Sequence, residues 1–123
     1  MEKIKGLIVA PFTAFDKNNA VNLKMVTEQA EMYKRNGLSG VFICGTTGES
    51  SALTMKEKKQ LFGEWSKQKT ENFKVIAFLG GTCIEECIEL AKYALELKLD
   101  AVSVTAPYYF RPTHVKTLVD FCI

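Results

Sequence analysis

The sequence contains no apolar run long enough to span a bilayer, which takes about 20 consecutive apolar residues. It has a single histidine, His114, and no Cys-x-x-Cys pair among its four cysteines, so the usual ligand spacing of a zinc site is missing. Its 16 basic and 14 acidic residues leave a net charge of +2, too small to indicate a nucleic-acid-binding surface. We therefore expect no metal, no nucleic acid and no membrane among its ligands and partners.

Several common signals are also missing. The first residues lack the apolar stretch of a signal peptide, so we expect a cytoplasmic protein. Neither the Gly-Lys-Ser/Thr of a phosphate-binding P-loop nor the Gly-x-Gly-x-x-Gly of a dinucleotide site occurs. The four cysteines are expected to be buried, reduced thiols. With 123 residues, 47% of them apolar, the chain has the length and composition of one domain, residues 1–123, with its own core.

Short apolar runs alternate with longer amphipathic segments along the chain. The apolar runs cover residues 6–10, 40–44, 74–79 and 101–105, and such continuous runs are typical of strands buried on both faces. Apolar residues at helical spacing predict helices over residues 23–36, 54–67, 82–97 and 113–123. Strands that alternate with amphipathic helices form a parallel sheet with right-handed crossovers.

Local signals mark where the helices begin and which side they bury. Thr54 and Glu57 form a capping box, and Thr82 and Glu85 repeat the pattern. Asn36-Gly37 supplies a left-handed stop for the first helix. The second helix is expected to bury Leu61, Phe62 and Trp65, and the third Ile84, Cys87, Ile88, Ala91, Leu95 and Leu97.

The spacing of the strands limits the fold to two architectures. The strands recur about every 30 residues, whereas a closed (β/α)8 barrel needs eight such units and ~250 residues. The chain is therefore either a small open, doubly wound, flavodoxin-like sheet or the first four βα units of a barrel. Because it stops within a predicted helix, we favour the half barrel.

In parallel α/β folds the functional residues gather at the carboxyl ends of the strands. There the loop Gly45-Thr46-Thr47-Gly48-Glu49 combines two hydroxyls with glycines that let backbone N–H groups approach a ligand. It is either a neutral cradle for a small anion such as a carboxylate, or an ordinary Gly-rich turn. Of Tyr108 and Tyr109, we expect one ring to serve proton transfer and the other to pack.

Other polar residues are weaker candidates for chemistry. Glu49 is expected to satisfy backbone N–H groups or favour a helix start. Arg111 and His114 are expected on the surface, and the lysines on solvated helix faces. No lysine lies at the end of a predicted strand.

Three segments together resemble a known superfamily. Gly6-Leu7-Ile8-Val9-Ala10-Pro11-Phe12-Thr13, Gly45-Thr46-Thr47-Gly48-Glu49-Ser50 and Pro107-Tyr108-Tyr109-Phe110-Arg111-Pro112 occur in the order and at the separations found in the N-acetylneuraminate lyases and dihydrodipicolinate synthases. The resemblance covers the whole chain. It implies the N-terminal half of a (β/α)8 TIM barrel from a class I aldolase, and no cofactor.

The resemblance also implies roles for individual residues. Thr46 and Thr47 would hold the carboxylate of pyruvate, helped by the N–H of Thr47 or Gly48. Tyr109 would reach across a subunit interface of a homotetramer and join a proton relay. The lysine that forms the Schiff base and the main catalytic tyrosine belong to strands six and five, which these 123 residues do not include.

Features of both branches of the superfamily are present. The Gly-Thr-Thr-Gly-Glu-Ser segment resembles the synthases, whereas residues 36–43, Glu64-Trp65 and Ala106-Pro107 resemble the sialic acid lyases. Residues 79–82 lack the asparagine usual in the synthases. We favour the lyase branch, which cleaves N-acetylneuraminate reversibly to pyruvate and N-acetylmannosamine, with a synthase as the alternative. A non-catalytic half barrel that binds a partner is the alternative of another class.

Overall fold

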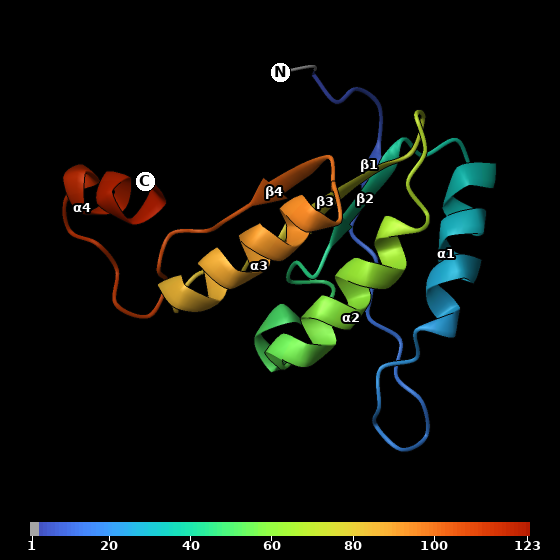
Figure 1. The fold of residues 1–123 in the computed structure, drawn as a ribbon, viewed down its shortest axis with the longest axis horizontal. Helices are drawn as coiled ribbons and strands as arrows, with labels where there is room; N and C mark the ends of the chain where they lie inside the picture. Colours follow the sequence, from blue (N-terminus) through green and yellow to red (C-terminus); the bar gives the residue numbers. More distant parts are fainter. Residues whose placement is uncertain (1–2) are drawn as a thin grey trace.

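A computed structural model describes residues 3–123. Four parallel strands, β1 (Ile8–Val9), β2 (Gly40–Ile43), β3 (Lys74–Phe78) and β4 (Ala101–Ser103), form one sheet in the order β1-β2-β3-β4. The helices are α1 (Lys24–Arg35), α2 (Met55–Ser66), α3 (Ile84–Glu96) and α4 (Val115–Cys122), with a short 3-10 helix, η1 (Ser50–Ala52). Figure 1 shows α1, α2 and α3 following one another alongside the sheet.

The consecutive strand order decides between the two expected architectures. Each strand pairs in parallel with the next, as in the registers Val9 to Val41, Val41 to Val75 and Ala77 to Val102. Right-handed crossovers between sequential neighbours place all the connecting helices on one face of the sheet, as in a barrel. A flavodoxin-like sheet has the order 2-1-3-4-5 and helices on both faces. The half barrel is confirmed, and the open doubly wound sheet is excluded.

The two faces of the sheet differ in burial. Val41, Val75 and Ala77 point toward the helices and are fully buried, while Phe42 and Phe78 on the other face remain half-buried and stack at 6.0 Å between ring centroids. The prediction of burial on both faces is therefore wrong for the described residues. Alternate side chains point to opposite faces of a strand, and the three helices cover just one of them. The half-buried face corresponds to the interior of a closed barrel.

The start of α2 follows the sequence prediction. The backbone N–H of Glu57 donates to Thr54 Oγ1 at 3.3 Å, and the N–H of Thr54 donates to Glu57 Oε2 at 2.8 Å, which completes the capping box. The helix buries Leu61, Phe62 and Trp65 against the sheet, as expected. The cap at the start of α2 and the packing of its buried face thereby fix the direction of this helix, which follows the β2 loop.

The predictions for α3 need correction. Its N-cap is Cys83, whose backbone is extended and whose side chain makes no capping hydrogen bond, so the box of Thr82 and Glu85 does not form. The helix starts one residue too late for Thr82 to act as its cap. Its buried residues are Cys87, Leu90 and Ala94, at spacings of three and four, whereas the following predicted core residues are exposed: Ile84, Ile88 and Leu95.

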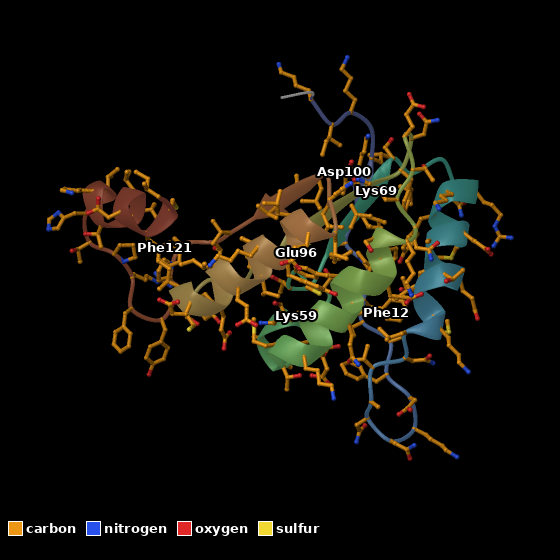
Figure 2. The ribbon with its side chains drawn as sticks, in the orientation of Figure 1. Phe12, Lys59, Lys69, Glu96, Asp100 and Phe121 are labelled. Carbon is orange, nitrogen blue, oxygen red and sulfur yellow. The ribbon has the colours of Figure 1, made fainter. Side chains whose placement is uncertain are left out.

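The cysteines and the last helix also differ from expectation. Cys44 and Cys87 are buried free thiols, but Cys83 and Cys122 are exposed. Helix α4 has no buried residue and stands apart from the other helices, with Phe121 on it (Figures 1 and 2). It follows a long loop after β4 and makes no core contact within the described part of the chain.

Polar contacts hold the amino-terminal edge of the sheet. Asp100, just before β4, accepts a hydrogen bond from the backbone N–H of Val75 at 2.9 Å and faces the ammonium groups of Lys74 and Lys69 at 3.6 and 3.9 Å. Figure 2 shows Asp100 and Lys69 close together at this edge. These contacts help to fix the register of β4 on β3, and so the position of the loops at the opposite, carboxyl edge.

Candidate active site

The loop after β2 is folded tightly. Cys44 and Glu49 both have left-handed backbone angles, with φ of 54° and 59°. The N–H of Glu49 donates to the carbonyl of Thr46 at 3.0 Å, and the N–H of Ser50 donates to the carbonyl of Gly45 at 3.3 Å. Such conformations cost free energy in non-glycine residues and persist where the surroundings impose them. The loop therefore presents Thr46 and Thr47, both exposed, at the carboxyl edge of the sheet.

Gly48 is the point at which this loop is held against the end of β1. A Cβ atom there would lie 3.2 Å from Cys44 Cα, closer than side-chain carbons normally approach, and in van der Waals contact with the carbonyl oxygen of Pro11 at 3.4 Å. The buried hydroxyl of Thr13 donates to the carbonyl oxygen of Gly48 at 2.7 Å. The loops after β1 and β2 are thus joined through a contact 35 residues apart in sequence.

A cavity of about 720 Å³ opens at the same edge. It is bounded by the loops after β2 and β3 and by the ends of α2, α3 and β4, and Thr46, Gly81 and Tyr108 are among its lining residues. Of the predicted site residues, Thr46 lines the cavity, whereas Thr47, Gly48 and Tyr109 lie outside it. Thr46, Thr47 and Gly48 belong to one continuous loop, whereas Tyr109 lies apart from them.

The two neighbouring tyrosines point to different surroundings. Tyr108 contributes to the cavity wall. Tyr109 is 78% exposed and meets the ring of Phe110 edge to face, with 5.0 Å between centroids. Arg111 and His114 are exposed, as predicted. Within the described chain, Tyr109 therefore lies outside this site.

Sequence reasoning missed Lys58 among the residues at the cavity. We expected the lysines to be solvated, but Lys58 is 7% exposed and lines the cavity. The signal was present in the periodicity, because Lys58 precedes Leu61 by three residues and Trp65 by seven, which places it on the buried stripe of α2. Its neighbour Lys59 points outward and pairs with Glu89 at 2.5 Å (Figure 2).

Two thiols close to Lys58 are poor nucleophiles. Burial raises the pKa of Cys44 to about 12, with the positive charge of Lys58 acting against this shift. Burial also raises the pKa of Cys87, whose Sγ lies 3.6 Å from the carbonyl oxygen of Leu79. Both thiols are protonated at neutral pH, so the reactive thiolate form is scarce. The site offers hydroxyls, backbone N–H groups and one ammonium group.

The described residues, 3–123, show no sign of a membrane span or a metal site. None of the helices there combines the length and apolar character needed to cross a membrane. No three histidine, cysteine or acidic side chains in that range cluster closely enough to hold a metal ion.

Known proteins are similar to this chain in sequence and fold. Human N-acetylneuraminate lyase is 31% identical over 122 residues, and the 4-hydroxy-tetrahydrodipicolinate synthase of Bartonella henselae is 38% identical over 109 residues. These matches cover 98% and 89% of this chain, respectively, but 38% and 37% of the relatives. The chain thus spans about two fifths of the length of these relatives.

Solved structures agree with the sequence matches. The structure of Proteus mirabilis N-acetylneuraminate lyase superposes with a TM-score of 0.93 at 33% identity, covering 98% of this chain and 41% of that one. The dihydrodipicolinate synthase from Aquifex aeolicus gives a TM-score of 0.87 at 34% identity, covering 94% and 39%. Residues 3–121 match the family profile described as the Dihydrodipicolinate synthetase family. The four βα units are part of a TIM barrel, and the chain belongs to the Dihydrodipicolinate synthetase family.

Proposed function

We propose that the protein carrying this sequence is a pyruvate-dependent class I aldolase that acts as an N-acetylneuraminate lyase. The observation that carries the proposal is the exposed Thr46-Thr47 pair, held by Gly48 and Thr13 at the carboxyl edge of a partial TIM barrel. Similarity to N-acetylneuraminate lyases over 98% of the chain supports this reaction. In (β/α)8 enzymes this edge is where catalysis takes place.

The loop suits the carboxylate of a keto acid. The hydroxyls of Thr46 and Thr47 would donate to its two oxygens, and the backbone N–H of Gly48 would help to orient it. A carboxylate fixed in this way presents its neighbouring ketone in one direction, and such positioning lowers the barrier of the bimolecular step that follows. Because these donors are neutral, they bind the anion without making a nearby amine less basic, as a positively charged donor would.

The chemistry needs one group that this segment does not supply. We place the amine that attacks the ketone on a lysine outside these 123 residues. Its nitrogen forms a C=N bond to the keto carbon as water leaves. The hydroxyl group on the departing carbon then loses its proton and becomes the aldehyde carbonyl of N-acetylmannosamine, while the C–C bond breaks and the protonated imine accepts its electron pair. Protonation of the resulting enamine and hydrolysis then free pyruvate and the amine.

Trapping with borohydride tests this assignment. The natural protein is incubated with pyruvate and sodium borohydride, and its intact mass and digested peptides are measured. We expect one reduced pyruvate on a lysine outside residues 1–123, and weaker labelling in a Thr47→Val variant because the carboxylate is held less well. A natural protein that gains no adduct would favour the non-catalytic half barrel, and an adduct on Lys58 would refute the assignment of the amine.

A dihydrodipicolinate synthase is the second candidate. It is favoured by the 38% identity to the Bartonella henselae synthase, which exceeds the 31% identity to the human lyase. The alignment with the synthase is the shorter of the two. A synthase would condense the same bound pyruvate with aspartate semialdehyde. Measuring pyruvate release from N-acetylneuraminate and pyruvate consumption with aspartate semialdehyde on one preparation separates the two candidates. Activity with the semialdehyde alone would overturn the lyase proposal.

We also propose a cytoplasmic homotetramer in which the exposed Tyr109 reaches a neighbouring subunit. Its 78% exposure and lack of contact with the Thr46 loop fit a residue that acts outside its own subunit. Light scattering of the natural protein tests the assembly. A Tyr109→Phe variant that keeps the assembly but loses turnover would support the proton relay, and full turnover in that variant would contradict it.

A further inference from the structure

Helix α1 carries a polar side chain on its buried face. The buried residues of this helix are Val26, Gln29, Ala30 and Tyr33, at the spacing of a single helical stripe. Gln29 is 5% exposed, although such a stripe normally carries apolar or aromatic side chains. A buried amide group costs free energy unless it is hydrogen-bonded. The hydrogen bond that Gln29 makes therefore identifies what this position contributes.

The side-chain amide of Gln29 holds the end of β1. Its Nε2 donates to the carbonyl oxygen of Phe12 at 3.2 Å, across 17 positions of sequence. β1 ends at Val9, so the chain beyond it lies outside the paired part of the sheet. In the part of the chain that the structure describes, residues 11–13 make two hydrogen bonds to other elements, the one from Gln29 and the one from Thr13 to Gly48. These two contacts therefore anchor this segment.

The two contacts lie in series between α1 and the loop after β2. Phe12 accepts the hydrogen bond from Gln29, and the next residue, Thr13, donates its buried hydroxyl to the carbonyl oxygen of Gly48 at 2.7 Å. Because the two anchored residues are consecutive, a shift of the Phe12 carbonyl also displaces the Thr13 hydroxyl. Gly48 directly follows the two threonines of the loop, so the displacement reaches their hydroxyls.

We propose that Gln29 is a positioning residue of the candidate site, which holds the end of β1 and, through Thr13, the loop that binds the carboxylate. The inference rests on the proposed function, because the loop is there assigned to the carboxylate of a keto acid. Gln29 acts through the backbone of Phe12 and not on the substrate itself. Loss of its N–H donors therefore weakens the binding of the keto acid and leaves the later chemical steps unchanged, which raises KM without lowering kcat.

Variants of the natural protein test this role. Gln29→Met has nearly the same size but no donor, and Gln29→Asn keeps the amide but is one methylene group too short to reach Phe12. Val26→Ala is the matched control, because it removes buried apolar contact one turn earlier on α1 and no polar contact. We expect KM for pyruvate in the condensation direction to rise about three- to tenfold in both Gln29 variants, with kcat within about twofold. V26A should lower the melting temperature and leave KM within about twofold.

A double variant tests whether Gln29 and Thr13 act in series. If they do, Q29M combined with Thr13→Val raises KM about as much as T13V alone, because the second change breaks a chain that is already broken. An effect equal to the product of the two single effects would mean that the residues act independently, and this would overturn the proposal. A rise of KM in V26A equal to that in Q29M would also overturn it.

Hydrogen exchange without substrate separates this inference from the proposed function. The backbone N–H groups of Glu49 and Ser50 donate to carbonyls within the loop, so their exchange reports on its order. We expect a peptide covering residues 45–50 to exchange at least about threefold faster in Q29M, and a peptide from α3 to exchange at the natural rate. Unchanged exchange of the loop would overturn the inference. Faster exchange of the loop in a protein that traps no pyruvate with borohydride would support the positioning by Gln29 and reject the proposed function alone.

Discussion

Replacing Thr13 with valine tests how the loop that carries Thr46 and Thr47 is held. Valine has nearly the shape of threonine but cannot donate the hydrogen bond to the carbonyl oxygen of Gly48, which is 2.7 Å long and buried. The substitution therefore leaves that carbonyl without its donor while changing packing little. We expect the loop carrying Thr46 and Thr47 to be less well ordered, and pyruvate to bind more weakly.

The size of the effect follows from the burial of the contact. A buried acceptor that loses its donor costs about 1–3 kcal/mol, and every 1.4 kcal/mol corresponds to a tenfold change in an equilibrium constant. If the loop carries most of this cost, KM for pyruvate rises about tenfold and kcat changes by less than twofold. Steady-state kinetics of the natural protein, with pyruvate varied in the condensation direction, measure both quantities.

A matched variant makes this prediction specific to the hydroxyl. Thr13→Ser keeps the donor and loses one methyl group, so its KM should stay within about threefold of the natural value. Thermal melting of both variants separates a local from a global effect. Equal increases in KM for T13S and T13V, or an unchanged KM in T13V, would refute the idea that the hydrogen bond to Gly48 positions the loop.

Three further predictions concern the site and its support. Gly48→Ala forces a methyl group to 3.2 Å from the backbone of Cys44, so we expect trapping of pyruvate by borohydride to fall at least tenfold, and full trapping would contradict this. Thr54→Ala removes the cap of α2 and should lower the free energy of unfolding in urea by about 1 kcal/mol. Hydrogen bonds from Thr54 lower the pKa of Glu57, so in the natural protein this stabilisation is present at neutral pH and is lost as pH falls through that lowered pKa; an equal deficit of T54A at low and neutral pH would contradict it. Because the pKa of Cys44 is about 12, iodoacetamide at pH 8 should alkylate Cys83 and leave Cys44 unmodified, as read by peptide mass; early labelling of Cys44 would show that it is accessible.

The order of helices and strands could be predicted because each depends on local patterns. The continuous runs at residues 40–44 and 74–79 and the capping box at Thr54 are local signals, and the structure confirms each of them within a residue or two. The face of α3 could not be predicted in the same way. Apolar residues surround much of that helix, so periodicity alone did not show that Leu90 and Ala94 would face the sheet.

The candidate site was predictable in part for a similar reason. The Gly45–Gly48 loop is contiguous, so its glycines and hydroxyls can be recognised together in the sequence. The support from Thr13 comes from the preceding βα unit, and its proximity to the loop depends on the register of β1 on β2. Lys58 lies on α2, in the same βα unit as the loop. The burial of Lys58 also differs from the general expectation that lysine side chains are solvated. Its neighbour Lys59 follows that expectation.

The consecutive order of the strands has a consequence for how the chain acquires its structure. Ile8 pairs with Gly40, Gly40 with Lys74 and Ile76 with Ala101, so every pairing joins one βα unit to the next along the chain. Within residues 3–123 each of these pairings joins strands that are neighbours in sequence, which keeps the entropy of loop closure small at each step. The sheet can therefore grow from its first strand as the ribosome releases each unit, and the Thr46 loop can be anchored by Thr13 before β3 has been synthesised.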